Sequence, residues 1–383
     1  MKKILIVHNF YRNYGGEDSN IYEEIKFLKN QFNVKFFEAK NDFKFSFFAL
    51  LSLVIRSNFK INREFKNHLE EFQPDSVYIH NTWFNINLGI FKILTKREIT
   101  AVVKIHNFRY DCARYFLAKN HLKGTNRCNA CGFEKKNGKF INKYFETSYV
   151  KSLILYFYSL KYFRILKNSK IKIIAINNFH KIQLIKFGIP ESKIMVINNP
   201  LNIENIPARV KEKNIVYAGR LSREKGLIEL MDAWLAAGIK DYNLIIIGDG
   251  DLKKELEQKY SQKNIKFLGF LPNEIVLEYI SKSTAVVTGT KLYEGHPRLL
   301  SEASALGTLS IYPSFGGMDE FFPENYQFAY EQFNYEDLKN KFLLLTEKKK
   351  VEESTNSALL HTQKQLNSKV LMEKFINVFE ESF

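Results

Sequence analysis

Two glutamates in the second half of the chain have the type and spacing needed to bind hydroxyl groups. They lie at the ends of the segment Glu294-Gly295-His296-Pro297-Arg298-Leu299-Leu300-Ser301-Glu302. Gly295 and Pro297 predict a loop that opens into a helix at about Arg298. Glu302 would then lie about one turn along this helix and face the same cleft as Glu294. One carboxylate accepts hydrogen bonds from two neighbouring hydroxyls, so the pair suits a sugar, although a helix start with ordinary charged residues fits either glutamate singly.

A second segment could bind a diphosphate. It is Gly219-Arg220-Leu221-Ser222-Arg223-Glu224-Lys225-Gly226-Leu227, between a predicted strand and a predicted helix. A short turn flanked by glycines brings backbone N–H groups and a helix N-terminus to one point, where Arg220 and Lys225 add two cations. A strand–helix turn with solvated basic residues would have the same sequence, so both interpretations stay open for this segment alone.

The elements that must position these residues form two similar series. In the first half, apolar runs that end in polar residues predict strands at 4–8, 34–37, 77–80, 100–105 and 172–177. After a boundary rich in Asn and Pro near 198–207, strands are predicted at 214–217, 243–247, 265–268 and 285–287, and a helix at 227–237. Strands that alternate with helical patterns indicate parallel sheets, and ligands bind beyond the carboxyl ends of such strands. We therefore expect an α/β protein with two doubly wound domains.

Five blocks of the second half resemble, in order and spacing, the retaining glycosyltransferases of family 4, which have the GT-B fold. The blocks are Gly219-Arg220…Lys225-Gly226, Gly248-Asp249-Gly250, Gly269-Phe270-Leu271, Glu294…Glu302 and Gly316-Gly317-Met318-Asp319-Glu320. The first half resembles the family in outline, through Gly15-Gly16-Glu17-Asp18, His80-Asn81 and His106-Asn107. The resemblance implies two Rossmann-like domains that face each other across a cleft. Residues 1–200 would bind the acceptor, residues 201–365 the nucleotide-sugar donor, and a helix at 366–383 would pack back on the first domain.

The resemblance also implies a role for each residue of the donor site. Arg220 and Lys225 would neutralise the donor diphosphate in place of a metal. Glu302 would hold the ribose hydroxyls, and Glu294 would contact the transferred sugar. The other implied donor contacts are Gly15, Gly16, Gly248, Gly250, Phe270, Leu271, Gly295, His296, Arg298 and Leu299. The expected donor is a UDP-sugar, with a GDP-sugar as the alternative, and no further cofactor is expected.

The implied reaction transfers a hexose-type sugar with retention of its anomeric configuration. Glu294 and His106 are the implied catalytic residues, His106 as a hydrogen-bond partner near the reacting carbon. In this chemistry the leaving phosphate helps to deprotonate the acceptor, so no protein base is required. The family usually has Glu-Gly-Phe-Gly where this chain has Glu294-Gly295-His296-Pro297, and Pro297 has no N–H to offer the donor. The identity of the sugar therefore stays open.

The basic residues of the chain are concentrated in its first half. Residues 1–200 carry 34 Lys and Arg against 15 Asp and Glu, a net charge of +19, whereas residues 201–383 carry 23 and 26, a net charge of −3. This asymmetry indicates an anionic partner, either a membrane surface or nucleic acid. The apolar run 45–55 and the segment 153–162, with basic residues at Lys151, Lys161 and Arg164, favour the membrane. Neither segment is long enough to span it, and no nucleic-acid-binding motif is present.

We therefore expect a cytoplasmic protein that is peripheral on the inner face of the cell membrane and does not bind nucleic acid. Its expected acceptor is a polyprenyl-diphosphate-linked glycan, in the synthesis of bacterial O-antigen, capsule or exopolysaccharide. The alternatives are a basic nucleic-acid-binding protein, and a sugar-nucleotide epimerase or lectin-like relic on the same fold. The 34 Phe and 20 Tyr are attributed mostly to overall composition, with no functional role.

Three cysteines are too few, and odd in number, for a disulfide framework, which indicates a reducing compartment. Cys128 and Cys131 form a Cys-x-x-Cys pair with Cys112 nearby. A zinc site with three thiolates would need a histidine, and His106 and His121 are the nearest in sequence. Because no second close pair of cysteines is present, we interpret these residues as a reduced loop without a metal.

Overall fold

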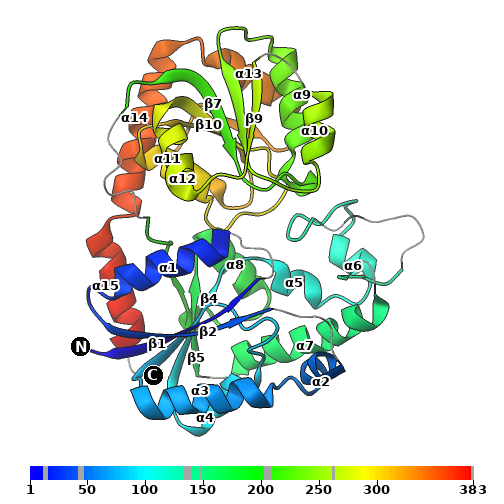
Figure 1. The fold of residues 1–383 in the computed structure, drawn as a ribbon, viewed down its shortest axis with the longest axis vertical. Coiled ribbons are helices and arrows are strands. Elements are labelled where there is room, and N and C mark those ends of the chain that lie inside the picture. Colours follow the sequence, from blue (N-terminus) through cyan, green and yellow to red (C-terminus); the bar gives the residue numbers. More distant parts are fainter. Residues whose placement is uncertain are drawn as a thin grey trace. The chain divides into compact units, whose positions relative to one another are not determined.

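The computed structural model describes residues 1–11, 16–41, 47–132, 134, 140–145, 148–168, 170–201, 209–260 and 264–380. They form two compact units: unit 1 contains residues 1–200 and 368–383, and unit 2 contains residues 201–367. Each unit is built on a six-stranded parallel sheet (Figure 1). No helix in this described part of the chain is long and apolar enough to cross a membrane.

The sheet of unit 1 has the strand order β2-β1-β3-β4-β5-β6, and every neighbouring pair is parallel. Its strands are β1 (Lys3–Phe10), β2 (Asn33–Lys40), β3 (Ser76–Ile79), β4 (Thr100–Ile105), β5 (Ile171–Ala175) and β6 (Ile194–Val196). All four residues of β3 are buried, and so are the last seven of β1. Such continuous apolar runs, without alternation, are typical of a parallel sheet that helices cover on both faces.

Helices lie on both faces of this sheet, and the last helix of the chain belongs to unit 1 (Figure 1). Phe375 and Phe379 of that helix contact the ring of Tyr78 on β3, with centroids 6.2 and 5.4 Å apart. The segment 368–380 therefore completes the core of the unit in which the chain begins. The helices are α1 (Gly16–Leu28), α2 (Phe47–Ile55), α3 (Phe59–Phe72), α4 (Gly89–Lys96), α5 (Arg109–Ala113), α6 (Ala118–Leu122), α7 (Tyr149–Asn168), α8 (Asn178–Lys186) and α15 (Ser368–Glu380).

The sheet of unit 2 has the strand order β12-β11-β10-β7-β8-β9. Its strands are β7 (Glu212–Ala218), β8 (Asn243–Ile247), β9 (Ile265–Gly269), β10 (Ser283–Val287), β11 (Leu309–Ser314) and β12 (Ala329–Glu331). Its helices are α9 (Leu227–Ala237), α10 (Lys253–Lys259), α11 (Asn273–Lys282), α12 (Arg298–Ala305), α13 (Tyr335–Leu344) and α14 (Lys348–Gln365). Helices α9 and α13 pack together through an edge-to-face contact of Trp234 with Phe342, at 5.2 Å.

All nine predicted strands are present: β4 and β8 have the predicted bounds, and the ends of the others differ by at most three residues. Strands β6, β11 and β12 are not among the predictions. β11 contains Pro313, a residue that argues against a central strand because it has no N–H to donate. The sheet accommodates it because the pairing of β11 with β10 ends at Ile311, so Pro313 faces only β12. The two other strands are three residues long, too short to show a pattern.

Candidate functional site

The order in which the chain adds strands to the parallel sheet of unit 2 reverses at its middle, between β7 and β10. From β7 the chain continues to β8 and β9 on one side, and then returns to β10, β11 and β12 on the other. In parallel sheets of this kind, ligands bind beyond the carboxyl ends of the strands at such a switch point. The loop after β7 carries Arg220 and Lys225, and the loop after β10 carries Thr290 and Glu294.

Lys225 and Glu294 meet across this switch point. The Lys225 ammonium donates to Glu294 Oε1 at 2.8 Å, and the Thr290 hydroxyl donates to the same oxygen at 3.0 Å. The two loops approach closely because Gly226 has φ +66°, and a Cβ there would overlap the carbonyl oxygen of Gly289. Both charged side chains keep 24% of their surface exposed, so the pair remains accessible to a ligand.

A second ion pair forms in the first turn of α12. Arg298 Nε donates to Glu302 Oε1 at 2.6 Å, and the Glu302 side chain is only 6% exposed. Pro297 precedes the helix, and His296 lies beside it with its ring 4.6 Å from that of Phe321. The helix that the sequence predicts at about Arg298 is therefore confirmed, with Glu302 one turn along it.

The other donor residues predicted in unit 2 lie at the same end of the sheet. Gly248 and Gly250 follow β8, and a Cβ on Gly248 would overlap the carbonyl oxygen of Gly219, so the turns after β7 and β8 are in direct contact. Phe270 follows β9 and is 74% exposed. Arg220 is exposed, and its carbonyl accepts a hydrogen bond from the Tyr217 hydroxyl at 2.9 Å. The remaining positions are Leu271 after β9, Gly295 in the loop after β10 and Leu299 in α12.

The predicted residues of the first half lie in unit 1. Gly15 lies outside the described residues, and Gly16 is the first residue of α1 rather than part of a longer loop. His106 follows β4, and its Nε2 is hydrogen-bonded to Nδ1 of His80 at 2.8 Å, with the two rings stacked at 5.0 Å. Both histidines line a pocket of unit 1.

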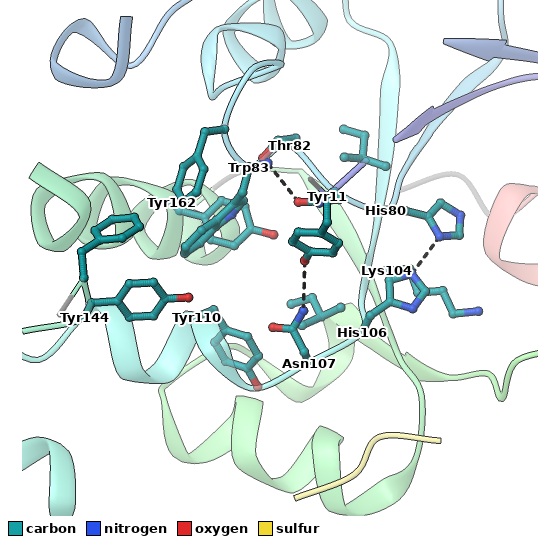
Figure 2. Close-up of a pocket in the computed structure, with 15 residues that line it drawn as sticks. Tyr11, His80, Thr82, Trp83, Lys104, His106, Asn107, Tyr110, Tyr144 and Tyr162 are labelled. Carbon is teal, nitrogen blue, oxygen red and sulfur yellow. Dashed lines mark hydrogen bonds between the residues drawn. The ribbon is translucent and has the colours of Figure 1, made fainter. Parts of the chain in front are cut away.

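This pocket has a volume of about 250 Å³ and opens at the carboxyl ends of β3 and β4. In Figure 2, Trp83, Tyr144 and Tyr162 lie toward one end of it, and His80 and His106 lie at the other. Asn107 donates to the Tyr11 hydroxyl at 3.5 Å. Aromatic rings thus make up much of the lining, together with polar groups such as His80 and Asn107. This composition suits a sugar or another amphipathic group. The full lining is Tyr11, Ile79, His80, Asn81, Thr82, Trp83, Phe84, Lys104, Ile105, His106, Asn107, Tyr110, Tyr144, Phe145 and Tyr162.

A buried polar network supports the histidine end of the pocket. Lys104 forms an ion pair with Glu24 of α1 at 2.8 Å, and the Tyr78 hydroxyl donates to the same carboxylate at 2.6 Å. Burial, together with the charge of Lys104, lowers the pKa of His80 and of His106 well below its ordinary value. Both imidazoles are therefore neutral at neutral pH, and one donates to the other.

Most residues of this pocket are not among the predicted site residues. The aromatic residues were attributed to overall composition, but five of them line the cavity: Tyr11, Trp83, Tyr110, Tyr144 and Tyr162. The sequence does contain one indication of the pocket: Trp83 lies close to His80-Asn81, and Tyr110 lies close to His106-Asn107. The same region also brings His121, and not His106, to the three cysteines.

The two doubly wound units have the GT-B glycosyltransferase fold, as solved relatives show. HepE of Anabaena, in complex with UDP and glucose, superposes with a TM-score of 0.66 over 99% of both chains at 15% identity. Residues 199–358 match the family described as Glycosyl transferases group 1, which places that domain in unit 2. The two ion pairs described above therefore lie within the segment that matches this family.

Two curated proteins are similar to part of the chain. One is an uncharacterized glycosyltransferase of Methanocaldococcus jannaschii, 31% identical over 35% of this chain and 40% of the relative. The other is the amylovoran biosynthesis glycosyltransferase of Erwinia amylovora, 32% identical over 27% of this chain and 30% of the relative. The matched segments thus span well under half the length of these relatives.

Proposed function

We propose that this protein is a retaining, metal-independent glycosyltransferase that uses a nucleoside diphosphate sugar as donor. The observation that carries this proposal is the Lys225–Glu294 pair at the switch point of a group 1 glycosyltransferase domain. A cation and a carboxylate at one point suit the two halves of such a donor, because the diphosphate is anionic and the sugar offers hydroxyls.

Lys225 and Arg220 bind the donor diphosphate in this proposal. Lys225 is already oriented by Glu294, and Arg220 is exposed in the adjacent turn, so a diphosphate in the crevice reaches both cations. Glu302 accepts hydrogen bonds from the ribose, and Arg298 holds its carboxylate in position at 2.6 Å. UDP is the proposed nucleotide, supported by the UDP complex of HepE.

Glu294 contacts the transferred sugar, where its negative charge is most useful as the anomeric carbon becomes positive. The bond from that carbon to the diphosphate breaks, and the acceptor oxygen binds on the same face of the sugar. The acceptor proton passes to a phosphate oxygen of the leaving group. The neutral imidazole of His106 contributes a hydrogen bond near the reacting carbon.

The acceptor binds in the aromatic pocket of unit 1 in this proposal. Aromatic faces pack against sugar rings, and Asn107 with Asn81 offers amide groups to sugar hydroxyls. The acceptor is a polyprenyl-diphosphate-linked glycan of a bacterial surface polysaccharide, and the protein is peripheral on the inner membrane face. The resemblance to an amylovoran biosynthesis enzyme supports the setting, and the charge of +19 on residues 1–200 supports the membrane contact.

The test is donor binding by calorimetry, with Arg220→Ala, Lys225→Ala and a control at the other end of β7. Each of the first two should weaken UDP-sugar binding by ~2–4 kcal/mol, the usual loss for a desolvated charge-assisted contact. Lys213→Ala should bind like the wild type, because Lys213 lies at the start of β7 in an exposed pair with Asp241. EDTA should not change donor binding, and turnover should need no added Mg²⁺ or Mn²⁺. A strict requirement for a divalent ion, or equal binding by all variants, would contradict the proposal.

A further inference from the structure

Three thiols and an imidazole gather in the segment between β4 and α7, outside the sheet of unit 1. Cys112 lies on α5, His121 on α6, and Cys128 and Cys131 on the turn that follows α6. Their four ligand atoms all lie within 4.8 Å of one another. Cys112, His121 and Cys128 are buried, and Cys131 is half-buried.

Two of the distances between these atoms match the edges of a tetrahedral metal site. With Zn–S bonds of about 2.3 Å and Zn–N bonds of about 2.0 Å, a tetrahedron separates two sulfurs by about 3.8 Å and a sulfur from a nitrogen by about 3.5 Å. Cys112 Sγ and Cys128 Sγ are 3.7 Å apart, and Cys131 Sγ is 3.4 Å from His121 Nε2. A disulfide needs a separation of about 2.05 Å and would use only two of the four groups.

The backbone around the cluster supports ligation. The N–H of Ala130 donates to Cys128 Sγ at 3.4 Å, and the N–H of Gly132 donates to the Cys128 carbonyl at 2.8 Å. A tight turn of this kind turns both sulfurs of Cys-x-x-Cys to one side. An amide that donates to sulfur also stabilises the thiolate, which is the form that binds a metal.

Asn142 orients the histidine. Its side-chain amide nitrogen lies 3.1 Å from His121 Nδ1 and also donates to the carbonyls of Cys112 and Tyr115, both at 3.0 Å. These contacts position the ring so that Nε2 lies 3.4 Å from Cys131 Sγ.

We propose that Cys112, His121, Cys128 and Cys131 bind one structural Zn²⁺ ion. Three thiolates and one imidazole in a closed tetrahedral set are the ligands of a structural zinc site, and softer sulfur ligands disfavour Mg²⁺ or Ca²⁺. Helices α5 and α6 have five residues each, too few for stability on their own, so a cross-link between them has a clear structural use.

The ion would also fix one wall of the aromatic pocket. Tyr110 lies two residues before Cys112, and Tyr144 lies two residues after Asn142, and both tyrosines line the cavity. Ligation at Cys112 and support from Asn142 thus hold the backbone on either side of these rings. The zinc site does not depend on the proposed reaction, since its ligands lie outside the pocket lining.

The test is the metal content of the full chain, purified with a thiol reductant and without chelator, then equilibrated with zinc and desalted. We expect one zinc ion per chain by plasma mass spectrometry. Cobalt(II) in its place should give a thiolate-to-cobalt charge-transfer band and the intense visible bands of tetrahedral cobalt. His121→Gln and Cys128→Ser should lose most of the zinc, His121→Cys should keep it as a four-thiolate site, and His68→Gln is the matched control.

The wild-type measurements decide the question even if a variant fails to fold. A folded wild-type chain that holds no zinc, takes up no cobalt and has three alkylatable thiols would overturn the proposal. A Cys112–Cys128 disulfide in peptide maps of the reductant-treated protein would overturn it as well. Full zinc content in both His121→Gln and Cys128→Ser would show that the ion binds elsewhere and that these residues are not its ligands.

Discussion

Each carboxylate of the proposed donor site is held by a neighbouring cation. Glu294 is paired with Lys225 from another loop, and Glu302 is paired with Arg298 on the same helix. The two carboxylates differ in exposure, at 24% and 6% of the side chain. Glu302 is therefore a fixed binding group, whereas Glu294 can exchange partners when an anionic donor approaches Lys225.

Substitution of the two glutamates should have different kinetic effects. Glu302→Gln removes ribose contacts and should mainly raise the KM for the donor. Glu294→Gln removes a charge that matters most as positive charge develops on the sugar, so kcat should fall. Steady-state kinetics with Glu278→Gln, an exposed residue of α11, as the control measure this difference. The assignment is wrong if both variants keep kcat/KM within about threefold of the wild type.

Two histidines of unit 1, His80 and His180, are buried, and a third, His106, is half-buried. Burial lowers the pKa of His80 and His106 well below the ordinary value, aided by the charge of Lys104, and lowers that of His180 to about 3. In the unfolded chain these groups take up protons below about pH 6.5. The unfolded state then binds more protons than the folded state, so stability is full above this pH and decreases as the pH falls.

Unit 1 should therefore lose stability between pH 7 and pH 5, by at most ~1.4 kcal/mol per pH unit for each histidine. Urea denaturation at several pH values, followed by a probe in unit 1, measures the slope. His180→Gln should have a smaller slope, because one buried imidazole no longer titrates on unfolding. His68→Gln, at a partly exposed position, should change the slope much less. A wild-type stability that is flat over this range would contradict the assignment.

At the scale of the elements, α7 has two different faces. Leu155, Tyr158 and Tyr162 are buried in unit 1. On the other face Val150, Leu153 and Phe157 are 63%, 41% and 48% exposed, and the exposed Lys161 and Arg164 continue the stripe. The predicted basic, aromatic segment 153–162 thus has one buried face and one exposed face. An exposed apolar stripe with adjacent cations is typical of a helix that lies in a membrane interface.

Helix α2 packs beside α7 (Figure 1) and also exposes apolar side chains. It covers most of the predicted apolar run 45–55, of which residues 45 and 46 lie outside the described residues. Leu51, Val54 and Ile55 are 41%, 54% and 48% exposed, whereas Leu53 is buried. The surface of both helices supports the proposed membrane contact.

The protein should therefore sediment with anionic liposomes in a salt-dependent way. Each Lys or Arg near such a surface contributes about 1 kcal/mol, and the attraction fades within a Debye length. Charge reversal at Lys151, Lys161 and Arg164 should reduce binding while donor hydrolysis is unchanged. The same number of reversals in unit 2, at exposed Lys240 and Lys266 with Lys213, should leave binding intact. Equal recovery in the supernatant with anionic and neutral liposomes at low salt would contradict membrane attachment.

The strands were predictable because buried parallel strands are continuous apolar runs, and the loops of unit 2 were predictable because their glycines and charges lie close together in sequence. The pocket of unit 1 was not, since its aromatic rings come from the segments after β1 and β3, from α5, from residues 144–145 and from α7, and have no common spacing. The Lys104–Glu24 pair was hidden for a similar reason: Lys104 lies within the strand Thr100–Ile105, and its partner lies 80 residues away.

At the scale of the whole molecule, the two units have different proposed roles: unit 2 binds the donor, and unit 1 binds the acceptor. Unit 2 is close to neutral and carries the paired charges of the donor site, whereas the excess positive charge lies in residues 1–200 with the aromatic pocket. A single chain thus combines the proposed anion-binding site in unit 2 with a pocket of a different chemistry in unit 1. Such a division suits transfer between a soluble donor and an amphipathic acceptor.

The central claim is that the chain transfers a sugar from a nucleoside diphosphate with retention of configuration. The most direct measurement is the NMR spectrum of the anomeric centre after incubation with isotope-labelled α-linked UDP-hexoses and a lipid-linked glycan fraction. We expect UDP release together with a new α-glycosidic signal, both lost in the Lys225→Ala variant and both independent of added Mg²⁺ or Mn²⁺. A β-linked product, or transfer that the Lys225→Ala variant retains in full, would contradict this account.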